Sequence, residues 1–464
     1  MKITVIGGSG YVGFITGLGF AQLGHDVTNV DIDEEKVEMM NEGQSPIYEE
    51  NVDLSEVLAS ALEEDRIRFT TDLAQGVRPA DVIFIAVGTP QSEDGEADLS
   101  QVIEVAEELV DYIEDYKVIA MKSTVPVGTI DLVCDILGRE KEEGKDFDVV
   151  SNPEFLREGK GLYDFFHPSR IVVGSSSAKA LEEMRKLYSP FVEEGDDPKS
   201  QIPNPKSQIP NPKSQILDPK KGVPLVETDI KSAQTIKYAS NTFLATRISF
   251  INEIAGLCEK IGADVEQVSE GMGYDPRIGH DYLSAGIGFG GPCLEKDLKA
   301  LIKISENNDY EPGFLSAVLE KNEEQIKEVV SKVKKLAGYP LYKKIITVYG
   351  LAFKAGTNDV RTSLSLRIID RLENLGAEIK AHDPRAIPEA RELRPKLDCY
   401  EDPYKAARHG NALLVLTDWE EYEELDYGRV RDNMAAPNLI DGRNTLDPER
   451  MKEMGFVYRG MGRG

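Results

Sequence analysis

The sequence has little cysteine and little positive charge, and each deficit argues against certain classes of protein. Its four cysteines (Cys134, Cys258, Cys293 and Cys399) are scattered over 464 residues without metal-ligand spacing. This usage favours a reducing compartment and argues against a disulfide framework or a metal centre. Lysine and arginine number 54 against 82 aspartates and glutamates, giving a formal net charge of -28. Nucleic acid and anionic membranes attract clustered cations, so neither is expected as a partner.

Long hydrophobic runs are also missing. No stretch of the sequence approaches the roughly 20 apolar residues that a membrane-spanning helix requires. The N-terminal MKITVIGG has too short an apolar run for a signal peptide, so we expect a cytoplasmic protein. The chain is long enough for two or three domains. Its hydrophobic content of 41% and charged content of 29% are ordinary for a globular protein.

The N-terminal segment predicts a dinucleotide site. Residues 2–6 and 26–33 have the pattern of buried parallel strands, with a glycine-rich turn and an amphipathic helix between them. The glycines that fit G-x-G-x-x-G are Gly8, Gly10 and Gly13. They allow a tight turn and close approach of a pyrophosphate to a helix N-terminus. Asp31 follows Gly13 by 18 residues and can accept hydrogen bonds from a ribose, which favours NAD over NADP. The structural alternative is a glycine-rich turn with a capping aspartate.

Alternation of strands and helices continues through the first 190 residues. Further strands are predicted within 80–90, 116–129, 146–155 and 169–174. Polar residues follow three of them: Thr89, Thr124 and Glu154. Ligands in open α/β sheets bind beyond the carboxyl ends of the strands, so these side chains are candidates for a cofactor or substrate site. Taken singly, each is better explained as a cap or turn residue; their shared position favours the site.

A tandem repeat interrupts the α/β pattern. Residues 198–218 read PKSQIPN, PKSQIPN, PKSQILD. A proline in every copy and the lack of an apolar seam exclude a helix or a coiled coil. We interpret 193–223 as a mobile surface loop with an extended backbone. It could bind a partner domain, but a neutral expansion is favoured and no catalytic role is expected.

A long helix is predicted from Thr228 to about Ile261, with Thr228 and Asp229 as candidate caps. Lys237 and Asn241 are four residues apart and therefore share one face. Such a pair is more often a solvated surface than a site. Small residues around it suit close packing, and a helix of this kind between two domains can pack on its twin, so we expect a homodimer or a higher homo-oligomer.

The sequence GFGGPCLEKD (288–297) contains the most reactive candidate. Pro292 suits the first position of a helix, so Cys293 is expected in the first helical turn, where free N–H groups and the helix dipole lower a thiol pKa. Gly290 and Gly291 would leave room for a substrate to reach the sulfur. Asp297, one turn later, could act as a base or orient water. The alternatives are a buried inert thiol and a capping acid.

The last part of the chain predicts a second doubly wound domain. Residues 343–384 read as strand, loop, helix and strand, and 411–419 and 438–444 read as further strands. Lys354 and Arg361 lie in the first strand–helix loop, where a phosphate would bind. Solvated loop cations are an equal alternative. The predicted fold is α/β, with two doubly wound Rossmann-like domains (1–192 and 326–464), the 193–223 insertion, and a small helical middle domain (224–325) that contains the long helix.

Taken together, these stretches resemble the nucleotide-sugar dehydrogenase family, which includes the UDP-glucose/GDP-mannose dehydrogenases. The matching sequences are GSGYVG, STVPVGT, NPEFLREG, IKYASNTFLATRISFINE, GFGGPCLEKD, YGLAFKAGTNDVR and IDGRNTLDPE. They cover nearly the whole chain except 193–223. The resemblance implies oxidation of a sugar C6 alcohol to a carboxylate with two NAD+, as in members that act on UDP-glucose, and a role in polysaccharide biosynthesis.

The resemblance also implies catalytic roles. Cys293 would capture the aldehyde as a thiohemiacetal, and a second oxidation would give a thioester that water hydrolyses. Lys237 would stabilise oxyanions, with Asn241 as a hydrogen-bond donor. Asp297 and Thr124 would hold or activate water. Glu154 would serve as an acid/base or aid hydrolysis.

Two sets of binding residues follow from the same resemblance. The implied NAD contacts are Gly8, Gly10, Tyr11, Val12, Gly13, Asp31, Lys36, Thr89, Thr124, Glu158, Lys296 and Arg361. The implied nucleotide-sugar contacts are Glu154, Phe155, Leu156, Arg157, Glu158, Lys237, Asn241, Arg277, Tyr282, Leu283, Ser284, Ala285, Gly286, Gly290 and Lys354. No metal is implied.

Three positions depart from the family pattern. The family usually has serine or another residue at Pro292 and proline at Glu295, and Asn358 replaces a more usual aspartate near Arg361. Glu295 adds negative charge beside Cys293, which opposes thiolate formation. We expect the helix dipole and Lys237 to outweigh this one solvated carboxylate.

Other readings remain open at this stage. The same chemistry could act on GDP-mannose or a UDP-N-acetylhexosamine. A two-electron β-hydroxyacid dehydrogenase would share the Rossmann domain and a catalytic lysine but would have no use for Cys293. A noncatalytic scaffold could bind partners through the proline-rich insertion. The number of NADH formed per substrate separates the first two readings.

Overall fold

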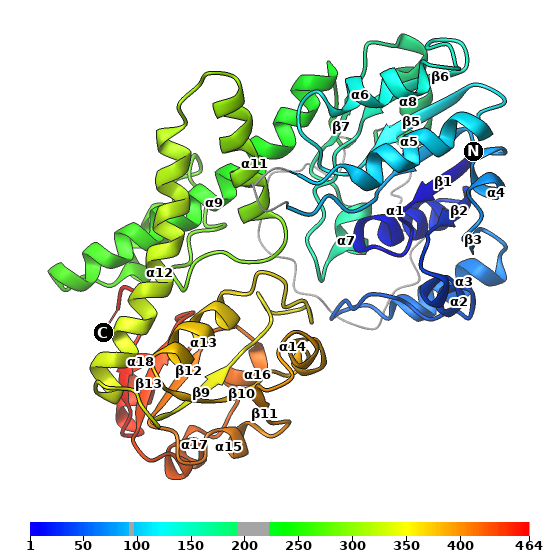
Figure 1. Cartoon of the computed structure of the whole chain (residues 1–464). Helices are drawn as coiled ribbons and strands as arrows, with labels where there is room; N and C mark the ends of the chain where they lie inside the picture. The colour runs from blue at the N-terminus through cyan, green and yellow to red at the C-terminus, as the bar shows by residue number, and fades with distance from the viewer. Residues whose placement is uncertain (92–96, 193–221, 464) are drawn as a thin grey trace. The chain divides into compact units, whose positions relative to one another are not determined.

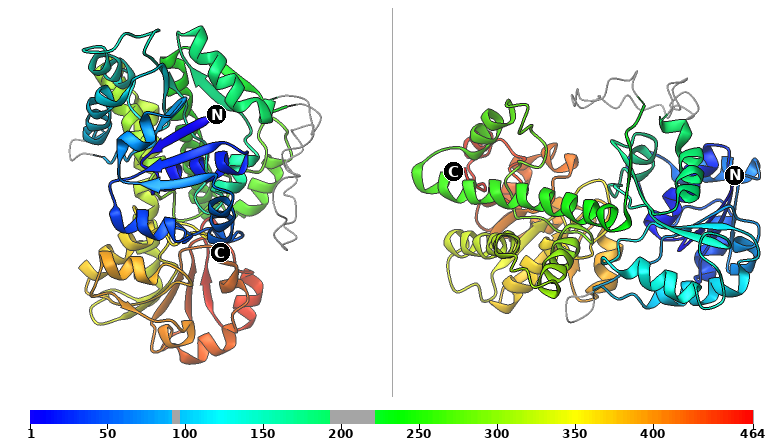
Figure 2. Two further views of the ribbon diagram at one scale, coloured as in Figure 1. Left: turned by 90° about the vertical axis from the view of Figure 1, so that its right-hand side faces the viewer. Right: turned by 90° about the horizontal axis from the view of Figure 1, so that it is seen from above.

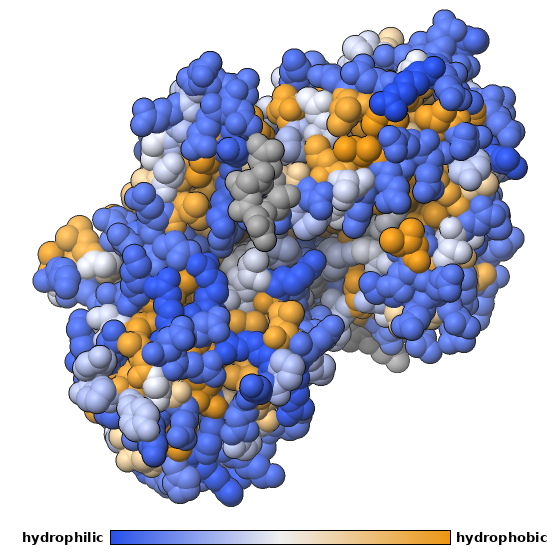
Figure 3. All heavy atoms as spheres, viewed as in Figure 1, coloured by the Kyte–Doolittle hydropathy of each residue, from blue (hydrophilic) through white to orange (hydrophobic). Residues whose placement is uncertain are grey.

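The computed structural model describes residues 1–91, 97–192 and 222–463, which form two compact units. The first unit is Met1–Ala239 and the second is Ser240–Gly464. Helices and strands of both units are labelled in Figure 1. Figure 3 shows a surface that is mostly hydrophilic in that view, with hydrophobic residues in scattered groups. In the described part of the chain, no helix is both long enough and apolar enough to cross a membrane.

The first unit is built on one sheet with helices on both faces. In the described residues its strand order is β3-β2-β1-β4-β5-β6-β7-β8. The strands are β1 (Lys2–Ile6), β2 (Asp26–Val30), β3 (Ile67–Thr70), β4 (Val82–Ile85), β5 (Lys117–Met121), β6 (Phe147–Ser151), β7 (Ile171–Gly174) and β8 (Leu225–Thr228). The first six in sequence are parallel and follow the order 3-2-1-4-5-6 of a dinucleotide-binding fold. β7 is antiparallel to β6 and parallel to β8.

Two hydrophobic clusters, one on each face, hold this sheet. The helices of the first unit are α1 (Tyr11–Gln22), α2 (Glu34–Asn41), α3 (Leu54–Glu63), α4 (Leu73–Val77), α5 (Ser100–Tyr112), α6 (Thr129–Leu137), α7 (Gly161–Phe166) and α8 (Ala178–Val192). One cluster includes Phe14 of α1 and Met184 of α8, and the other includes Leu109 of α5 and Val133 of α6. β4 and β5 are buried along their whole length, because helices cover both sides of a parallel sheet.

The second unit contains another parallel sheet, ordered β11-β10-β9-β12-β13-β14 in the described residues. Its strands are β9 (Ile345–Tyr349), β10 (Glu378–His382), β11 (Asp398–Cys399), β12 (Ala412–Val415), β13 (Asn438–Asp441) and β14 (Val457–Arg459). This is again the order 3-2-1-4-5-6. The helices after the first strand are α13 (Leu364–Asn374), α14 (Ile387–Leu393), α15 (Pro403–Ala406), α16 (Glu420–Glu423), α17 (Tyr427–Asn433) and α18 (Pro448–Glu453).

Helices dominate the chain between the two sheets: α9 (Ile230–Ile261), α10 (Val265–Gly273), α11 (Leu294–Asn307) and α12 (Gly313–Ala337). α9 is one unbroken helix of 32 residues (Figure 2). Its N-terminus is capped by Asp229, whose Oδ1 accepts a hydrogen bond from Ser232 N at 2.8 Å. The predicted cap and helix are therefore confirmed. Residues Ile230–Ala239 of α9 belong to the first unit, and the rest belong to the second.

The predicted α/β fold with two doubly wound domains is confirmed, and the structure shortens several strands. β2 ends at Val30, β4 at Ile85 and β5 at Met121. Asp31, Thr89 and Thr124 therefore lie in loops beyond the strands that were predicted to contain them. The repeat at 198–218 lies outside the described residues. The division of the chain at 192, 223 and 325 stays a prediction.

Candidate active site

The glycine-rich loop connects β1 to α1 and leaves space for a dinucleotide. The N–H groups of Gly7 and Gly8 both donate to the Val30 carbonyl, at 2.9 and 3.0 Å, which folds the loop onto β2. A Cβ at Gly13 would lie 2.0 Å from the Gly7 oxygen, so this position accepts no side chain. A Cβ at Gly10 would meet, of the described atoms, the Gly7 oxygen at 3.5 Å, an ordinary contact. The space before Gly10 is thus open to a pyrophosphate at the N-terminus of α1.

Asp31 lies directly beyond β2 and faces this loop. Its Oδ2 accepts a hydrogen bond from Ser9 N at 2.8 Å, and its Oδ1 accepts one from Asp33 N at 3.2 Å. The residue is half-buried, so acceptor positions on both oxygens remain for ribose hydroxyls. Lys36 lies on α2, where its ammonium is 3.3 Å from Asp33 Oδ2 in an exposed pair. The loop and the acid beyond β2 fit NAD.

Thr89 and Thr124 are brought together beyond β4 and β5. The Thr89 hydroxyl donates to the Thr124 carbonyl at 3.0 Å. Ser123 Oγ donates to the Val87 carbonyl at 2.7 Å, which ties the same two loops. Both predicted threonines therefore lie at the carboxyl ends of neighbouring strands, close to the point where the strand order reverses between β1 and β4.

A buried ion pair lies beyond β6. Lys237 Nζ of α9 donates to Glu154 Oε1 at 2.7 Å, and the two side chains are 5% and 8% exposed. Leu156 N donates to the other oxygen of Glu154 at 2.6 Å. Burial alone would raise the pKa of the Glu154 carboxyl, but the ammonium of Lys237 and these hydrogen bonds hold that pKa below its usual value. Lys237 is thus a buried residue and not part of a solvated surface.

Lys122, which sequence reasoning missed, is a second cation near this pair. Its ammonium donates to Asn152 Oδ1 at 3.2 Å. Burial, opposed by the charge of Glu154 and reinforced by that of Lys237, lowers the pKa of Lys122 to about 8. The signal in the sequence was a lysine at the end of the buried strand run KVIAMK, where the chain would otherwise remain apolar.

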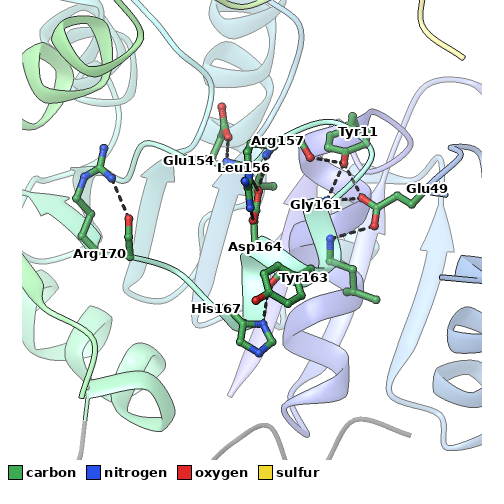
Figure 4. A network of polar contacts seen from close by, with 12 residues as sticks. Tyr11, Glu49, Glu154, Leu156, Arg157, Gly161, Tyr163, Asp164, His167 and Arg170 are labelled. Carbon is green, nitrogen blue, oxygen red and sulfur yellow. Dashed lines mark hydrogen bonds and ion pairs between the residues drawn. The ribbon is translucent and has the colours of Figure 1, made fainter. Parts of the chain in front are cut away.

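The segment after Glu154 is held by one ion pair, which Figure 4 shows, and by one cation–π contact. The Arg157 guanidinium donates to Asp164 through Nε at 2.9 Å and through one terminal nitrogen at 2.5 Å. The Arg170 guanidinium lies over the Phe155 ring, 3.7 Å from its centroid. Glu158 is half-buried and raises the pKa of Tyr11 through its charge, so it lies near the glycine-rich loop. The implied residues at 155–158 are thus gathered beside that loop.

In the second unit, Cys293 is the N-cap of α11 and is exposed. Its carbonyl accepts a hydrogen bond from Asp297 N at 2.9 Å. The expected position of the cysteine at a helix N-terminus is confirmed. The expectation that Pro292 begins the helix is wrong, because α11 starts at Leu294 and Pro292 lies in the preceding turn. The cysteine still lies at the end of α11 where the first N–H groups have no intrahelical partner.

A buried carboxylate follows Cys293. Asp297 is 1% exposed. Its Oδ2 accepts a hydrogen bond from Asn241 Nδ2 at 2.6 Å, and its Oδ1 lies 3.1 Å from Lys296 Nζ. Asn241 comes from α9, one helical turn beyond Lys237. The structure therefore joins three of the predicted site residues around one carboxylate.

Glu295 and the glycines before Cys293 differ from expectation. Glu295 is not solvated: it is 8% exposed, with Lys299 Nζ at 2.7 Å and an Arg367 nitrogen at 3.4 Å. These two cations offset its charge beside the cysteine. Gly290 and Gly291 do not simply clear space for a substrate. A Cβ at Gly290 would lie 2.9 Å from the Thr362 oxygen, and one at Gly291 would lie 2.5 Å from the Phe353 ring. Both glycines allow close packing within the second unit.

Buried amides, which sequence reasoning also missed, hold the loop before Cys293. Asn252 Oδ1 accepts a hydrogen bond from Gly286 N at 2.8 Å. Asn322 accepts from Phe289 N at 2.8 Å and donates to the Phe289 carbonyl at 2.9 Å. Of the predicted loop residues, Leu283, Ala285 and Gly286 are buried, Gly290 is half-buried, and Tyr282 and Ser284 are exposed. The signal for Asn252 was its place 11 residues after Asn241, three turns along one helix face.

The remaining predicted cations lie on loops of the second unit. Arg277 is 88% exposed in its side chain and pairs with Asp275 at 2.6 Å. Arg361 pairs with Asp359 at 2.6 Å. Lys354 Nζ lies 5.6 Å from the centroid of the Phe353 ring. The Asp275 and Asp359 side chains are 31% and 13% exposed, so Arg361 in particular is held by a largely buried carboxylate. Among the described residues, no cluster of histidine, cysteine, aspartate and glutamate could hold a metal ion.

The loop, the acid beyond β2 and the exposed cysteine at a helix N-terminus define a dinucleotide-dependent dehydrogenase with two Rossmann-like units. The comparisons with known proteins agree. Residues 1–192, 231–324 and 347–448 match the NAD binding domain, the central domain and the UDP binding domain of one family. The chain belongs to the UDP-glucose/GDP-mannose dehydrogenase family. It is an NAD-dependent nucleotide-sugar dehydrogenase.

Relatives and solved structures match along the whole chain. The sequence is 42% identical to UDP-glucose 6-dehydrogenase TuaD of Bacillus subtilis, covering 100% of this chain and 93% of that one. It is 41% identical to UDP-glucose 6-dehydrogenase of Rhizobium meliloti, covering 100% of both. Among solved structures, a UDP-glucose dehydrogenase from the archaeon Pyrobaculum islandicum matches with a TM-score of 0.86 at 34% identity, covering 100% and 98%.

Proposed function

We propose that the protein oxidises the C6 alcohol of UDP-glucose to the carboxylate of UDP-glucuronate, with two NAD+ reduced per sugar. The observation that carries this proposal is Cys293 at the N-cap of α11, four residues before buried Asp297. A two-electron alcohol dehydrogenase has no use for such a thiol. The names of the relatives support UDP-glucose as the substrate.

Exposure singles out Cys293 among the cysteines. Cys258 and Cys399 are buried. Burial raises the pKa of Cys399 to about 11 and that of Cys134 to about 12, which keeps both thiols protonated at neutral pH. Cys293 is exposed and is the N-cap of α11, where the first N–H groups have no intrahelical partner. We assign the nucleophile to Cys293 for these reasons.

Each oxidation removes a hydride, and bound NAD+ supplies the acceptor. In the first, the C6 alcohol loses a hydride and a proton and becomes an aldehyde. The Cys293 thiolate adds to that carbonyl, and the thiohemiacetal then loses a second hydride and a proton to give a thioester. Water attacks the thioester, the carbon–sulfur bond breaks, and a carboxylate and the Cys293 thiol result.

Other predicted residues would stabilise charge and move protons during the oxidation and hydrolysis steps. Lys237 would donate hydrogen bonds to the alkoxide and to the tetrahedral oxyanions, and Asn241 would help it. Asp297, with Thr124, would hold the attacking water and accept its proton. Glu154, which Lys237 keeps ionised, would take up protons released in oxidation or aid hydrolysis.

The same proposal assigns separate sets of residues to NAD and to the nucleotide sugar. Asp31 would accept hydrogen bonds from the adenosine ribose of NAD, and Lys36, Thr89, Glu158, Lys296 and Arg361 would complete its contacts. The segments 154–158 and 282–290 would contact the nucleotide sugar, with Arg277 and Lys354 near its phosphates. Support comes from the exposure of the Arg277 and Arg361 side chains, 88% and 62%, which leaves both guanidinium groups accessible to a phosphate.

The test measures NADH formed per mole of limiting UDP-glucose, for the wild type, Cys293→Ala and Cys293→Ser. We expect two NADH for the wild type and loss of complete turnover in both variants. The matched control is Cys258→Ala, a buried cysteine, which should keep the ratio of two. A ratio of one for the wild type, with Cys293→Ala unaffected, would show a two-electron dehydrogenase and make Cys293 a structural thiol.

Other nucleotide sugars form the second candidate. A UDP-D-ManNAc dehydrogenase from Pyrococcus horikoshii matches this chain with a TM-score of 0.82 at 26% identity, covering 100% of both chains. The same stoichiometric assay with UDP-N-acetylmannosamine and GDP-mannose separates these substrates. A kcat/KM for either that exceeds that for UDP-glucose would replace the proposed substrate and leave the chemistry intact.

We further infer that the protein is a homodimer or a higher homo-oligomer that pairs through α9. Phe243, Phe250 and Leu257 recur every seven residues and are 61%, 47% and 54% exposed, and Ile261 is 67% exposed. An apolar stripe at this spacing suits a second helix of the same kind. Light scattering should give at least twice the mass of one chain, and Phe250→Glu should lower it. A wild-type protein at monomer mass would contradict this inference.

We also propose that the protein works in the reducing cytoplasm. Its four cysteines, all of which lie in the described residues, form no disulfide. Cell fractionation with an antibody against the chain tests this location, and recovery outside the cytoplasmic fraction would contradict it.

A further inference from the structure

A buried tyrosine–carboxylate contact joins three separate stretches of the first unit (Figure 4). Glu49 lies after α2 and is 4% exposed. Its Oε1 accepts hydrogen bonds from the Tyr11 hydroxyl and from Gly161 N, both at 2.5 Å, and its Oε2 accepts one from Leu162 N at 3.3 Å. The glycine-rich loop and the N-terminus of α7 therefore share one carboxylate.

The contact extends to the segment that contains Glu154 and Glu158. The Tyr11 hydroxyl also lies 3.0 Å from the Arg157 carbonyl and accepts a hydrogen bond from Gly161 N at 2.9 Å. Figure 4 shows Tyr11, Glu49 and Gly161 converging at the end of this segment. A Cβ at Gly161 would lie 2.6 Å from the Tyr11 oxygen, so the position has no room for a side chain.

We propose that Glu49 is a positioning residue of the NAD site. Through the Tyr11 side chain and the amides of Gly161 and Leu162, it fixes the glycine-rich loop against the segment 154–160. Tyr11 is the first residue of α1, and the N–H groups of that helical turn would face the pyrophosphate of a bound dinucleotide. A change in the direction of the Tyr11 side chain therefore moves the groups that bind NAD.

The chemistry of the pair suits this role. Glu49 lies in no ion pair with a lysine or arginine among the described residues, and it is held by hydrogen-bond donors that are themselves fixed by the backbone. Burial raises the pKa of Glu49, while the donors Tyr11, Gly161 and Leu162 oppose that shift. Burial also raises the pKa of Tyr11, so its hydroxyl keeps the proton that it donates. That the segment 154–160 also contacts the nucleotide sugar rests on the function proposed above.

The experiment compares this contact with a similar one in the same unit. The Tyr116 hydroxyl donates to Asp148 Oδ2 at 2.7 Å, and Asp148 is 3% exposed. Asp148 lies on β6, and its other side-chain donor is Ser177 at 2.7 Å, so this pair makes no contact with the glycine-rich loop in the described structure. Tyr116→Phe and Asp148→Asn are therefore matched controls for Tyr11→Phe and Glu49→Gln.

Calorimetric titration of the full-length variants with NAD+ gives the dissociation constant, and thermal unfolding gives the stability of each. The net contribution of one typical hydrogen bond corresponds to about fivefold in an equilibrium constant. We expect Tyr11→Phe and Glu49→Gln each to raise the Kd for NAD+ by about that factor, and the double variant to add little to either. The two control variants should lower the Tm but leave the Kd within about twofold.

Equal Kd values for NAD+ in the wild type, Tyr11→Phe and Glu49→Gln, with lowered Tm, would overturn the proposal and leave Glu49 a structural residue. Tyr11→Phe removes a single oxygen, so its Kd for NAD+ tests the proposal even if Glu49→Gln does not fold. The titration needs no turnover. If the wild type forms no NADH from UDP-glucose, the proposed substrate fails, and the effect of Tyr11→Phe on NAD+ binding still tests the role of Glu49.

Discussion

The two sheets of this protein share the strand order 3-2-1-4-5-6 but use it differently. Each has an aspartate directly beyond its second strand: Asp31 after β2 and Asp383 after β10. Asp31 is half-buried and accepts hydrogen bonds from Ser9 N and Asp33 N. Asp383 is 2% exposed. The same position in the fold is open to a ligand in one unit and closed in the other.

The closed position is occupied by protein donors. Asp383 Oδ2 accepts hydrogen bonds from Leu351 N at 2.7 Å, Ala352 N at 3.0 Å and Trp419 Nε1 at 3.2 Å. Its Oδ1 accepts from Arg385 N at 2.9 Å and Ala386 N at 2.8 Å. A carboxylate surrounded in this way has little capacity left for ribose hydroxyls. Topology therefore supplies a place for an acid, and the neighbouring donors decide whether it binds a ligand or holds the chain.

The loops that follow the first strand of each sheet also differ in where they leave room for a ligand. At Gly10 of the first unit, a Cβ would make an ordinary contact of 3.5 Å with the Gly7 oxygen. At Gly350 of the second unit, φ is +98° and a Cβ would lie 2.4 Å from Thr417 Cβ. At Gly7, which like Gly350 directly follows the first strand, φ is +82° and a Cβ would lie 2.8 Å from the Ala86 backbone, so both loops are packed against their own sheets at this point. The first loop leaves room for a dinucleotide only further on, at Gly10.

The largest effect should come from Asp383→Ala, because it leaves several buried N–H groups without an acceptor. We expect the free energy of unfolding of the second unit to fall by about 3–5 kcal/mol. Trp419, the single tryptophan of the sequence, donates to Asp383, so its fluorescence in urea titrations reports this unit directly. Asp432→Ala, at an exposed pair with Arg431, is the control and should cost less than about 0.5 kcal/mol. A loss for Asp383→Ala as small as the control would contradict the structural role.

The two glycines provide a second test. Gly350→Ala should lower the free energy of unfolding by about 1–3 kcal/mol, because it adds a clash with Thr417 to a strained backbone. Its NAD+ affinity should stay unchanged. Gly10→Ala should keep the stability within about 1 kcal/mol but weaken NAD+ binding, because its methyl group enters the space of the pyrophosphate. Urea unfolding and NAD+ titration of both variants check these expectations. A variant that lowered the free energy of unfolding and the NAD+ affinity equally would contradict the difference between the two loops.

Asp31→Ala tests whether the carboxylate beyond β2, which is open to a ligand, binds NAD+. We expect the Kd for NAD+ to rise about tenfold, the equivalent of about 1.4 kcal/mol, and the preference over NADP+ to shrink, since the repulsion of a 2′-phosphate disappears. The Tm should change little. Asp33→Ala, which removes the neighbouring cap of α2 and its pair with Lys36, should leave the Kd within about twofold. An unchanged Kd for Asp31→Ala would show that Asp31, like Asp383, only holds the chain.

A pH-dependent effect is expected from Lys122, whose ammonium is buried in the first unit near Glu154 and Lys237. Its pKa is lowered to about 8 by burial, so between that value and the unfolded value of about 10.4 the unfolded chain binds more protons. The free energy of unfolding should therefore gain a contribution as the pH rises through this window. Lys122→Met should remove that gain, measured as the difference in urea midpoint between pH 8 and pH 10. Lys145→Met, at an exposed pair with Glu142, is the control and should keep the wild-type slope.

The sequence predicted the α/β fold and most of its elements because their signals are local. Apolar runs, glycines and caps report on the few residues around them, as at 2–6, at the glycine-rich loop and at Asp229. It also predicted Cys293 at a helix N-terminus, because proline and glycine mark where helices start. It erred by two residues on Pro292, since the hydrogen bonds that begin α11 do not depend on proline alone.

Local patterns could not predict which polar groups meet. Glu295 looked solvated beside Cys293, yet Lys299 and Arg367 compensate it in a buried position. Neither Lys122 nor Glu49 was singled out from the local sequence. Each gains its environment from segments tens of residues away, and burial then changes the pKa of a group by an amount that composition does not give.

By itself, the sequence determined the order of strands and helices, the glycine-rich turn and the cysteine, because hydrophobic period and backbone preference are properties of neighbouring residues. The tertiary structure alone decided that Lys237 pairs with Glu154, that Asn241 holds Asp297, and that Asp31 is open while Asp383 is closed. These outcomes depend on which donors the fold brings to a buried carboxylate. An ionised group removed from water requires such partners, and only long-range packing supplies them.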